Sequence, residues 1–115
     1  MKTIRDRIPL CPHGTKDNIS PNLILALERL ERELGRELKY NSGYRCPECN
    51  AAAGGSKNSA HMRGFAADPL VNNSVSRFRI LSAAVRLGFR RIGVGKTFIH
   101  LDVDTSLPQD VMWLY

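Results

Sequence analysis

The sequence lacks the long apolar segments of membrane-spanning and exported proteins. Its 115 residues contain no run near the roughly 18 apolar residues needed to cross a bilayer, and the apolar stretch near the start is too short for a signal peptide. We therefore expect that the protein does not insert into a membrane. We also expect that it is synthesised in the cytoplasm without an export signal.

Cysteine is scarce, with only Cys11, Cys46 and Cys49. An odd number in a chain without an export signal argues against a disulfide framework and leaves free thiols or metal ligands. Cys46 and Cys49 have the C-x-x-C spacing of a zinc knuckle, and Cys11 with His13 could complete a structural Cys₃His site that ties residues 1–19 to the domain. Alternatively, C-P-E-C only opens a short helix whose sulfurs point in different directions. Measuring the number of zinc ions bound per chain would distinguish these two hypotheses.

Aromatic residues make up only 7% of the chain, whereas basic residues are plentiful. The formal net charge of +6 and pI near 9.7 favour an anionic partner such as nucleic acid, membrane or cell wall. The arginines are spread along the chain, so charge alone does not identify the partner. The few aromatics show no stacking pattern around the arginines, which argues against nucleic acid.

The length and composition fit one soluble globular domain, which we expect to be monomeric. Residues 1–19, with two prolines and a polar stretch, predict an extended N-terminal arm lying across the surface, followed by a single domain over 20–115. Strands are predicted at 38–41, 65–71, 91–94, 98–103 and 111–114. With the helices, this order predicts an α+β fold with a small mixed or antiparallel sheet, two long helices and a short one.

The predicted helices have clear ends. Ser20 and Pro21 begin the first long helix and Gly35 ends it. A short helix is predicted over 47–53, and a second long helix over 74–87 is closed by Gly88. The residues of this second helix expected to face the core are Val75, Phe78, Leu81 and Val85.

Two of the three histidines lie near an acid in the sequence. Catalytic zinc sites use three nitrogen or carboxylate ligands and leave one position for water, and His61, Asp68 and His100 supply that number. Asp102 shares a strand face with His100, so it could act as general base or hold the His100 ring. Spacing does not decide between these roles. Nor does it exclude histidines that are ordinary core or surface residues.

Two segments carry a family resemblance. S-G-Y-R-C-P-E-C-N-A-A-A-G-G-S-K-N-S-A-H-M-R-G-F-A-A-D, residues 42–68, and F-I-H-L-D, residues 98–102, resemble the signatures of zinc D-alanyl-D-alanine carboxypeptidases and L-alanoyl-D-glutamate endopeptidases. The S-x-H-x-x-G-x-A-x-D part is specific, and with the W-L-Y tail the resemblance spans roughly the C-terminal two-thirds. It implies a hedgehog-like DD-peptidase fold and Zn²⁺ held by His61, Asp68 and His100.

The resemblance also suggests roles for residues around the metal. It implies that Arg45 fixes the substrate or polarises its scissile carbonyl, although Arg45 could instead hold the turn at 42–44. Ser59 is a candidate substrate-binding residue that could also only brace the metal loop. Several relatives place an acid three residues before the second metal histidine, where this chain has Thr97. Asp102 is therefore the remaining candidate for the catalytic base.

Two functions are compatible with these features. The first is a zinc-dependent peptidase acting on peptidoglycan stem peptides or cross-links, in cell-wall lysis or remodelling, with release by a lysis partner as in phage lysis systems. The alternative is a non-catalytic zinc-binding module that binds an anionic polymer, either cell wall or nucleic acid. The net charge and Thr97 motivate this alternative.

Overall fold

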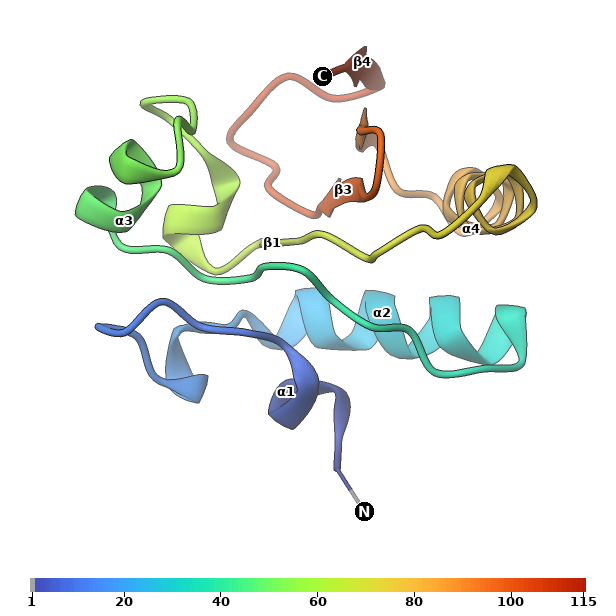
Figure 1. The fold of residues 1–115 in the computed structure, drawn as a ribbon, viewed down its shortest axis with the longest axis horizontal. Helices are drawn as coiled ribbons and strands as arrows, with labels where there is room; N and C mark the ends of the chain where they lie inside the picture. The colour runs from blue at the N-terminus through green and yellow to red at the C-terminus, as the bar shows by residue number, and fades with distance from the viewer. Residues whose placement is uncertain (1) are drawn as a thin grey trace.

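The computed structural model describes residues 2–115 and contains one four-stranded sheet beside the helices (Figure 1). The strands are β1 (Ala66–Ala67), β2 (Arg91–Val94), β3 (Ile99–Asp102) and β4 (Val111–Leu114). Their spatial order is β1-β3-β2-β4, with antiparallel β1-β3 and β3-β2 pairs and a parallel β2-β4 pair. The predicted α+β class with a small mixed sheet is confirmed.

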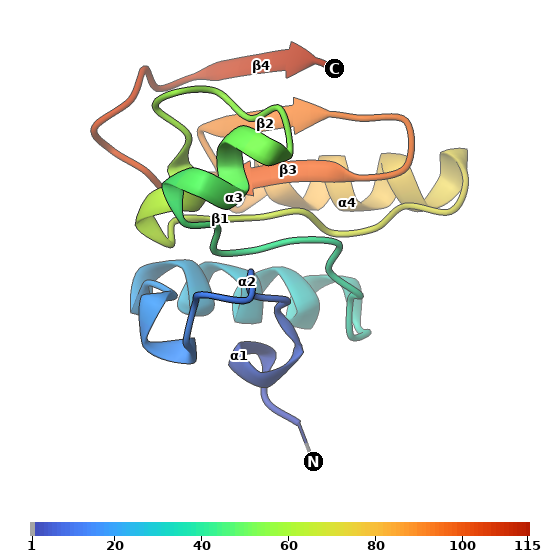
Figure 2. The same ribbon diagram turned by 60° about the vertical axis from the view of Figure 1, so that its left-hand side comes forward.

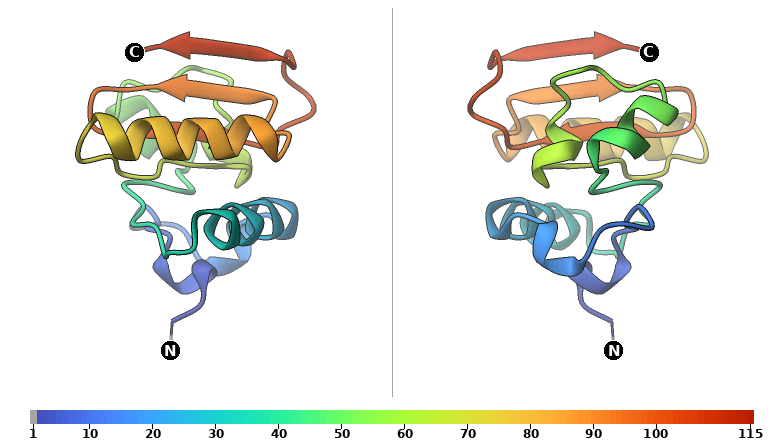
Figure 3. Two further views of the ribbon diagram at one scale, coloured as in Figure 1. Left: turned by 90° about the vertical axis from the view of Figure 1, so that its right-hand side faces the viewer. Right: turned by 90° about the vertical axis from the view of Figure 1, so that its left-hand side faces the viewer.

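The helices surround this sheet on several sides. They are α1 (Ile4–Arg7), α2 (Pro21–Leu34), α3 (Pro47–Ala52) and α4 (Ser74–Arg86), with 3₁₀ turns η1 (Lys16–Asn18) and η2 (Ala60–Arg63). α4 covers one face of the sheet, and α3 and η2 lie toward the other (Figure 3). α2 runs beneath the β1 edge and also packs against α4 (Figure 2). In the part of the chain that the structure describes, no helix combines the length and apolar character needed to cross a bilayer.

Helix α2 begins and ends where the sequence predicts. The Ser20 hydroxyl accepts a hydrogen bond from the Asn22 N–H, and Pro21 occupies the first helical position. Gly35 ends the helix in the left-handed conformation, with φ 71°. Its buried residues are Leu23, Leu27 and Leu30. These leucines therefore form the core face of this helix.

Helix α4 has the predicted position but a different buried face. Its buried residues are Ile80, Ala83 and Ala84. Leu81 packs against the core, but Val75, Phe78 and Val85 are 60%, 71% and 55% exposed, so their predicted inward orientation was wrong. The two alanines let the helix backbone approach its neighbours closely, a preference that counting large apolar residues does not reveal.

The N-terminal arm is more ordered than the extended conformation we expected. Thr3 and Asp6 form a reciprocal capping box that starts α1. Ile4, Ile8 and Ile19 are buried in the same hydrophobic cluster as the α2 leucines. A four-residue helix is too short to show periodicity in a sequence, which is why α1 was not predicted.

The strand predicted at 38–41 is reduced to one isolated pair, and the strand predicted at 65–71 is reduced to β1 and isolated pairs. Tyr40 pairs with Pro69 and Leu70 pairs with Phe98, while only β1 forms a ladder in this region. Pro69 cannot donate a ladder hydrogen bond, so regular pairing stops beside it. The backbone N–H of Asn41 still donates to the Asp68 carbonyl at 2.7 Å. This extended segment therefore holds Asp68 at the end of β1.

Candidate metal centre

Three side chains predicted as metal ligands meet at the β1-β3 edge of the sheet. His61 comes from η2, Asp68 follows β1, and His100 lies in β3; all three are buried. Asp68 Oδ1 lies 3.3 Å from His61 Nε2 and 3.2 Å from His100 Nδ1. One ligand atom from each residue therefore converges on a single point.

These separations fit a tetrahedral zinc ion. Bonds of about 2.0–2.2 Å to nitrogen and oxygen at tetrahedral angles put neighbouring ligand atoms about 3.3–3.5 Å apart. Asp68 Oδ1 and His100 Nδ1 are also buried with no hydrogen-bond partner. A buried polar atom without a partner is costly, and a cation between these two atoms would satisfy both. The donor set thus fits Zn²⁺.

Hydrogen bonds outside this cluster orient its ligands. His61 Nδ1 lies 2.7 Å from the Gly43 carbonyl oxygen. Because a carbonyl can only accept, Nδ1 carries the proton and Nε2 keeps its lone pair. The Ser42 hydroxyl donates to Asp68 Oδ2 at 2.7 Å, which leaves Oδ1 as the free carboxylate oxygen.

Asp102 lies on the other side of the His100 ring and is fully buried. Its Oδ2 is 2.7 Å from His100 Nε2, and its carboxylate also accepts from Arg91 Nε at 2.9 and 3.1 Å. The backbone N–H of Asp104 donates to Oδ1 as well. Both oxygens are therefore engaged away from Asp68. This geometry favours Asp102 as the residue that orients the His100 ring. It disfavours Asp102 as the general base, the other role that the sequence left open.

The local charges keep Asp68 ionised and favour a proton on His100. Burial alone would raise the pKa of Asp68, but the imidazoles of His100 and His61 outweigh it and hold that pKa well below its usual range. Burial also disfavours protonated His100, yet the carboxylates of Asp102 and Asp68 raise the pKa of its ring. The ionised Asp68 and the raised pKa of His100 both indicate a negative local potential, which suits a divalent cation.

The turn that carries His61 is fixed by its neighbours. The Ser59 hydroxyl accepts a hydrogen bond from the His61 N–H and so caps the 3₁₀ turn that carries His61. Gly64 ends η2 with φ 73°, and a side chain there would collide with the Asn18 carbonyl. The Arg45 N–H donates to the His61 carbonyl at 3.2 Å. This hydrogen bond places the backbone of Arg45 beside His61.

A cavity of about 380 Å³ opens onto these residues. It is lined by His61, His100, Arg45 and Ser59, and by Trp113 and Tyr115 of the C-terminal segment. The Nε atom of Arg45 is buried and has no hydrogen-bond partner. Within residues 2–115, no side chain lining the cavity carries a carboxylate.

Arg91 and Trp113 were not predicted as part of this site. Trp113 lies beside His100, with ring centroids 5.2 Å apart, and the Arg91 guanidinium lies 5.2 Å from the Trp113 ring centroid. In the β2-β3 hairpin Arg91 is directly opposite Asp102. The short connection between the strands predicted at 91–94 and 98–103 could have given this register, whereas the parallel placement of β4 has no local sequence signal.

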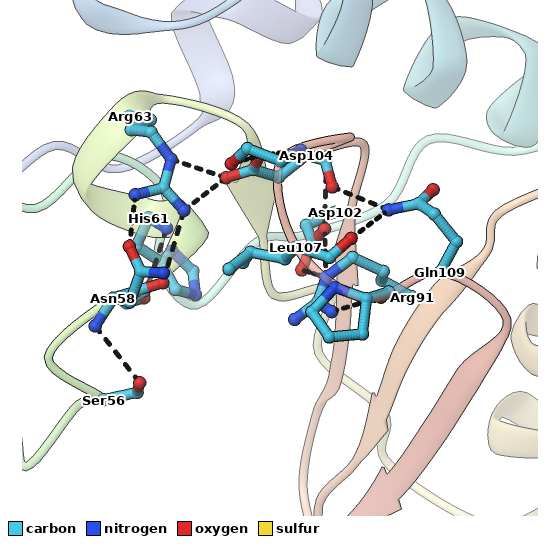
Figure 4. Close-up of polar contacts among 12 residues, drawn as sticks. Ser56, Asn58, His61, Arg63, Arg91, Asp102, Asp104, Leu107 and Gln109 are labelled. Carbon is cyan, nitrogen blue, oxygen red and sulfur yellow. Dashed lines mark hydrogen bonds and ion pairs between the residues drawn. The ribbon is translucent and has the colours of Figure 1, made fainter.

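A second polar network holds the segment after β3 (Figure 4). Arg63 of η2 donates to the Asp104 carboxylate at 2.6 Å and to Asn58 at 2.8 Å. Gln109 donates to the backbone oxygens of Asp104 and Leu107. These contacts fix the loop that contributes Leu107 to the cavity wall.

The other predicted ligand set also converges. Cys11, His13, Cys46 and Cys49 each present one ligand atom within 4.8 Å of the others. The three cysteines are free thiols and are partly exposed. This cluster lies outside the cavity residues described above.

Comparison with known protein families matches residues 6–102 to the family described as Peptidase M15. The match covers most of the chain and includes His61, Asp68 and His100. A search of curated proteins finds none that matches.

Proposed function

Because the chain belongs to the peptidase M15 family, we propose that it is a zinc-dependent peptidase that hydrolyses peptide bonds of peptidoglycan, in stem peptides or cross-links. The observation that carries this proposal is the pair of buried, partnerless atoms, Asp68 Oδ1 and His100 Nδ1, beside His61 at an open cavity. Family membership supports a peptidase, and the donor geometry supports zinc as its metal.

His61, Asp68 and His100 would hold the zinc ion. When bound, the ion supplies Lewis-acid chemistry that polarises the scissile carbonyl and makes water acidic enough to react near neutral pH. Asp102 accepts a hydrogen bond from the protonated Nε2 of His100 and so keeps Nδ1 free as a ligand. Asp102 therefore acts as a positioning residue, and Arg91 neutralises its buried charge.

Arg45 is the substrate-contacting residue of this proposal. Its side chain lines the cavity and its buried Nε has no hydrogen-bond partner, so the guanidinium has donors to offer to a substrate carbonyl or carboxylate. A guanidinium is always charged and offers several donors, which suits both substrate binding and stabilisation of charge on the carbonyl oxygen. Ser59 lines the same cavity while its hydroxyl caps η2.

The absence of an acid from the cavity lining, within the residues that the structure describes, favours one alternative. Thr97 replaces the acid found in several relatives, and Asp102 is engaged by His100 and Arg91. A chain without a side-chain base could bind zinc and an anionic polymer without cleaving it. The net charge of +6 would then support binding that weakens with salt.

Purified protein with stoichiometric zinc should release peptide fragments from isolated peptidoglycan, and mass analysis of defined muropeptides should identify the bond that is cut. His61→Ala should abolish release, and a chelator should do so reversibly. Arg86→Ala is the matched surface control, since Arg86 lies on α4 and pairs with exposed Glu33. Salt-sensitive binding without fragments would support the non-catalytic alternative; equal release by His61→Ala would refute the metal assignment.

A further inference from the structure

Four potential metal ligands meet where the N-terminal arm touches α3. Cys11 and His13 belong to the arm, Cys46 caps α3 and Cys49 lies in its first turn. His13 Nδ1 lies 3.4 Å from Cys46 Sγ and 3.5 Å from Cys49 Sγ. The two parts of the chain thus contribute two ligands each.

These distances match the edges of a tetrahedral zinc site with sulfur and nitrogen ligands. Zinc bonds of about 2.3 Å to sulfur and 2.0–2.1 Å to nitrogen place neighbouring sulfur and nitrogen atoms about 3.5 Å apart. The observed separations from His13 agree with this value. Nothing in ordinary side-chain packing requires two sulfurs to lie at that distance from the same ring nitrogen.

Backbone N–H groups point at the sulfurs in the same cluster. The Cys46 N–H donates to Cys11 Sγ at 3.4 Å, and the Cys49 N–H donates to Cys46 Sγ at 3.4 Å. Such donors stabilise negative charge on sulfur, and zinc binds cysteine as the thiolate. The C-x-x-C turn is therefore already arranged as a chelating loop.

We propose that Cys11, His13, Cys46 and Cys49 bind a structural zinc ion separate from the ion in the cavity. Four protein ligands complete the tetrahedral coordination of zinc, so no position is left for water or substrate. The role of this site is therefore structural. The proposal does not depend on peptidase activity, because its ligands are not those of the cavity.

The site would fasten the arm beside the substrate-contacting segment. Cys46 directly follows Arg45, and the Cys11 N–H donates to the Tyr44 carbonyl at 3.2 Å. Gly14 lies against the Tyr44 ring, where a side chain would not fit. Zinc bound here would therefore limit the motion of the backbone that presents Arg45 to the cavity.

Metal analysis of the purified chain tests this site. The wild type should contain about two zinc ions per chain, and both His61→Ala and the double variant Cys46→Ser/Cys49→Ser should contain about one. Combining all three substitutions should leave none. His61→Ala and the cysteine double variant control each other, because each removes ligands from one cluster only. If His61→Ala retains the wild-type zinc content, the cavity assignment fails while the cysteine site stands.

Cobalt substitution provides a second readout that does not require the cysteine variants to fold. Co²⁺ loaded into His61→Ala should give the intense near-ultraviolet absorption of thiolate-to-cobalt charge transfer and the visible bands of a tetrahedral ion. Modifying the thiols with a mercurial reagent should release about one metal ion per chain.

Three results would overturn the proposal. These are one zinc per wild-type chain that is lost entirely in His61→Ala, cobalt spectra without thiolate bands, and a disulfide between two of the cysteines in protein purified under reducing conditions.

Discussion

The Nε2 atom of His100 lies 2.7 Å from Asp102 Oδ2, while the Nδ1 atom of the same ring faces Asp68 Oδ1 at 3.2 Å. An ionised carboxylate can only accept, so the Asp102 contact places the ring proton on Nε2. A cation held between Nδ1 and Asp68 Oδ1 would then receive the lone pair of Nδ1. One buried carboxylate thus selects the tautomer that a metal ligand needs.

Asp102→Asn should weaken zinc binding at the cavity about 10- to 100-fold and reduce activity in parallel. The asparagine amide can no longer hold the His100 tautomer and neutralise Arg91 at once. Zinc affinity from competition with a chromogenic chelator, measured beside activity over a zinc titration, checks this. Asp110→Asn is the control, because Asp110 is 71% exposed and pairs with Arg90, away from His100. A loss of activity at saturating zinc with unchanged zinc affinity would instead make Asp102 the catalytic base.

Arg45→Lys should lower kcat/KM by about 10- to 100-fold while leaving the zinc content unchanged. Lysine keeps the charge but loses the planar donors, including the buried Nε that has no hydrogen-bond partner. Steady-state kinetics on a defined muropeptide measure the effect. The matched control is Arg86→Lys on α4, expected to have wild-type kinetics. If both variants behave alike, Arg45 has only a structural role at the 42–44 turn.

Gly64→Ala should destabilise the protein more than Gly35→Ala. Both glycines have φ near 70°, so alanine costs about 1 kcal/mol at either position. Only at Gly64 would the added carbon also collide with a backbone carbonyl, that of Asn18; at Gly35 nothing lies within 4 Å. Denaturant unfolding of both variants gives the comparison. Equal destabilisation would show that the η2 backbone shifts freely, and with it the position of His61.

Asp104→Asn should lower the free energy of unfolding at neutral pH by about 1–3 kcal/mol. Burial alone would raise the pKa of Asp104, but hydrogen bonds from Ser106 and the Arg63 guanidinium outweigh it and lower this pKa. A lowered folded-state pKa means stability that is present above about pH 4, the unfolded value, and lost as pH falls through the folded value.

The difference between wild type and Asp104→Asn should therefore shrink as the pH is lowered below about 4. Urea unfolding at several pH values checks this. Asp110→Asn is the control, since Asp110 is 71% exposed and its pair with Arg90 contributes little. A difference that does not change with pH would show that the ionised form of Asp104 is not what stabilises the loop.

Much of the candidate metal centre was accessible from the sequence because its potential ligands lie in short, specific motifs. His61, Asp68 and His100 were predicted together, and the structure brings their ligand atoms together. The sequence motifs could not decide whether Asp102 is a general base or a partner of the His100 ring. Whether it faces the metal or the far edge of His100 depends on the ring orientation, which Arg91 on the neighbouring strand helps to set.

By itself the sequence determined the ends of α2 and α4 and the β2-β3 hairpin, because capping residues, glycines and turn residues act through local backbone geometry. Tertiary structure alone decided which face of α4 is buried, how β4 joins β2, and that Trp113 reaches His100. These features depend on contacts between distant segments, where close packing against a particular neighbour outweighs local preference.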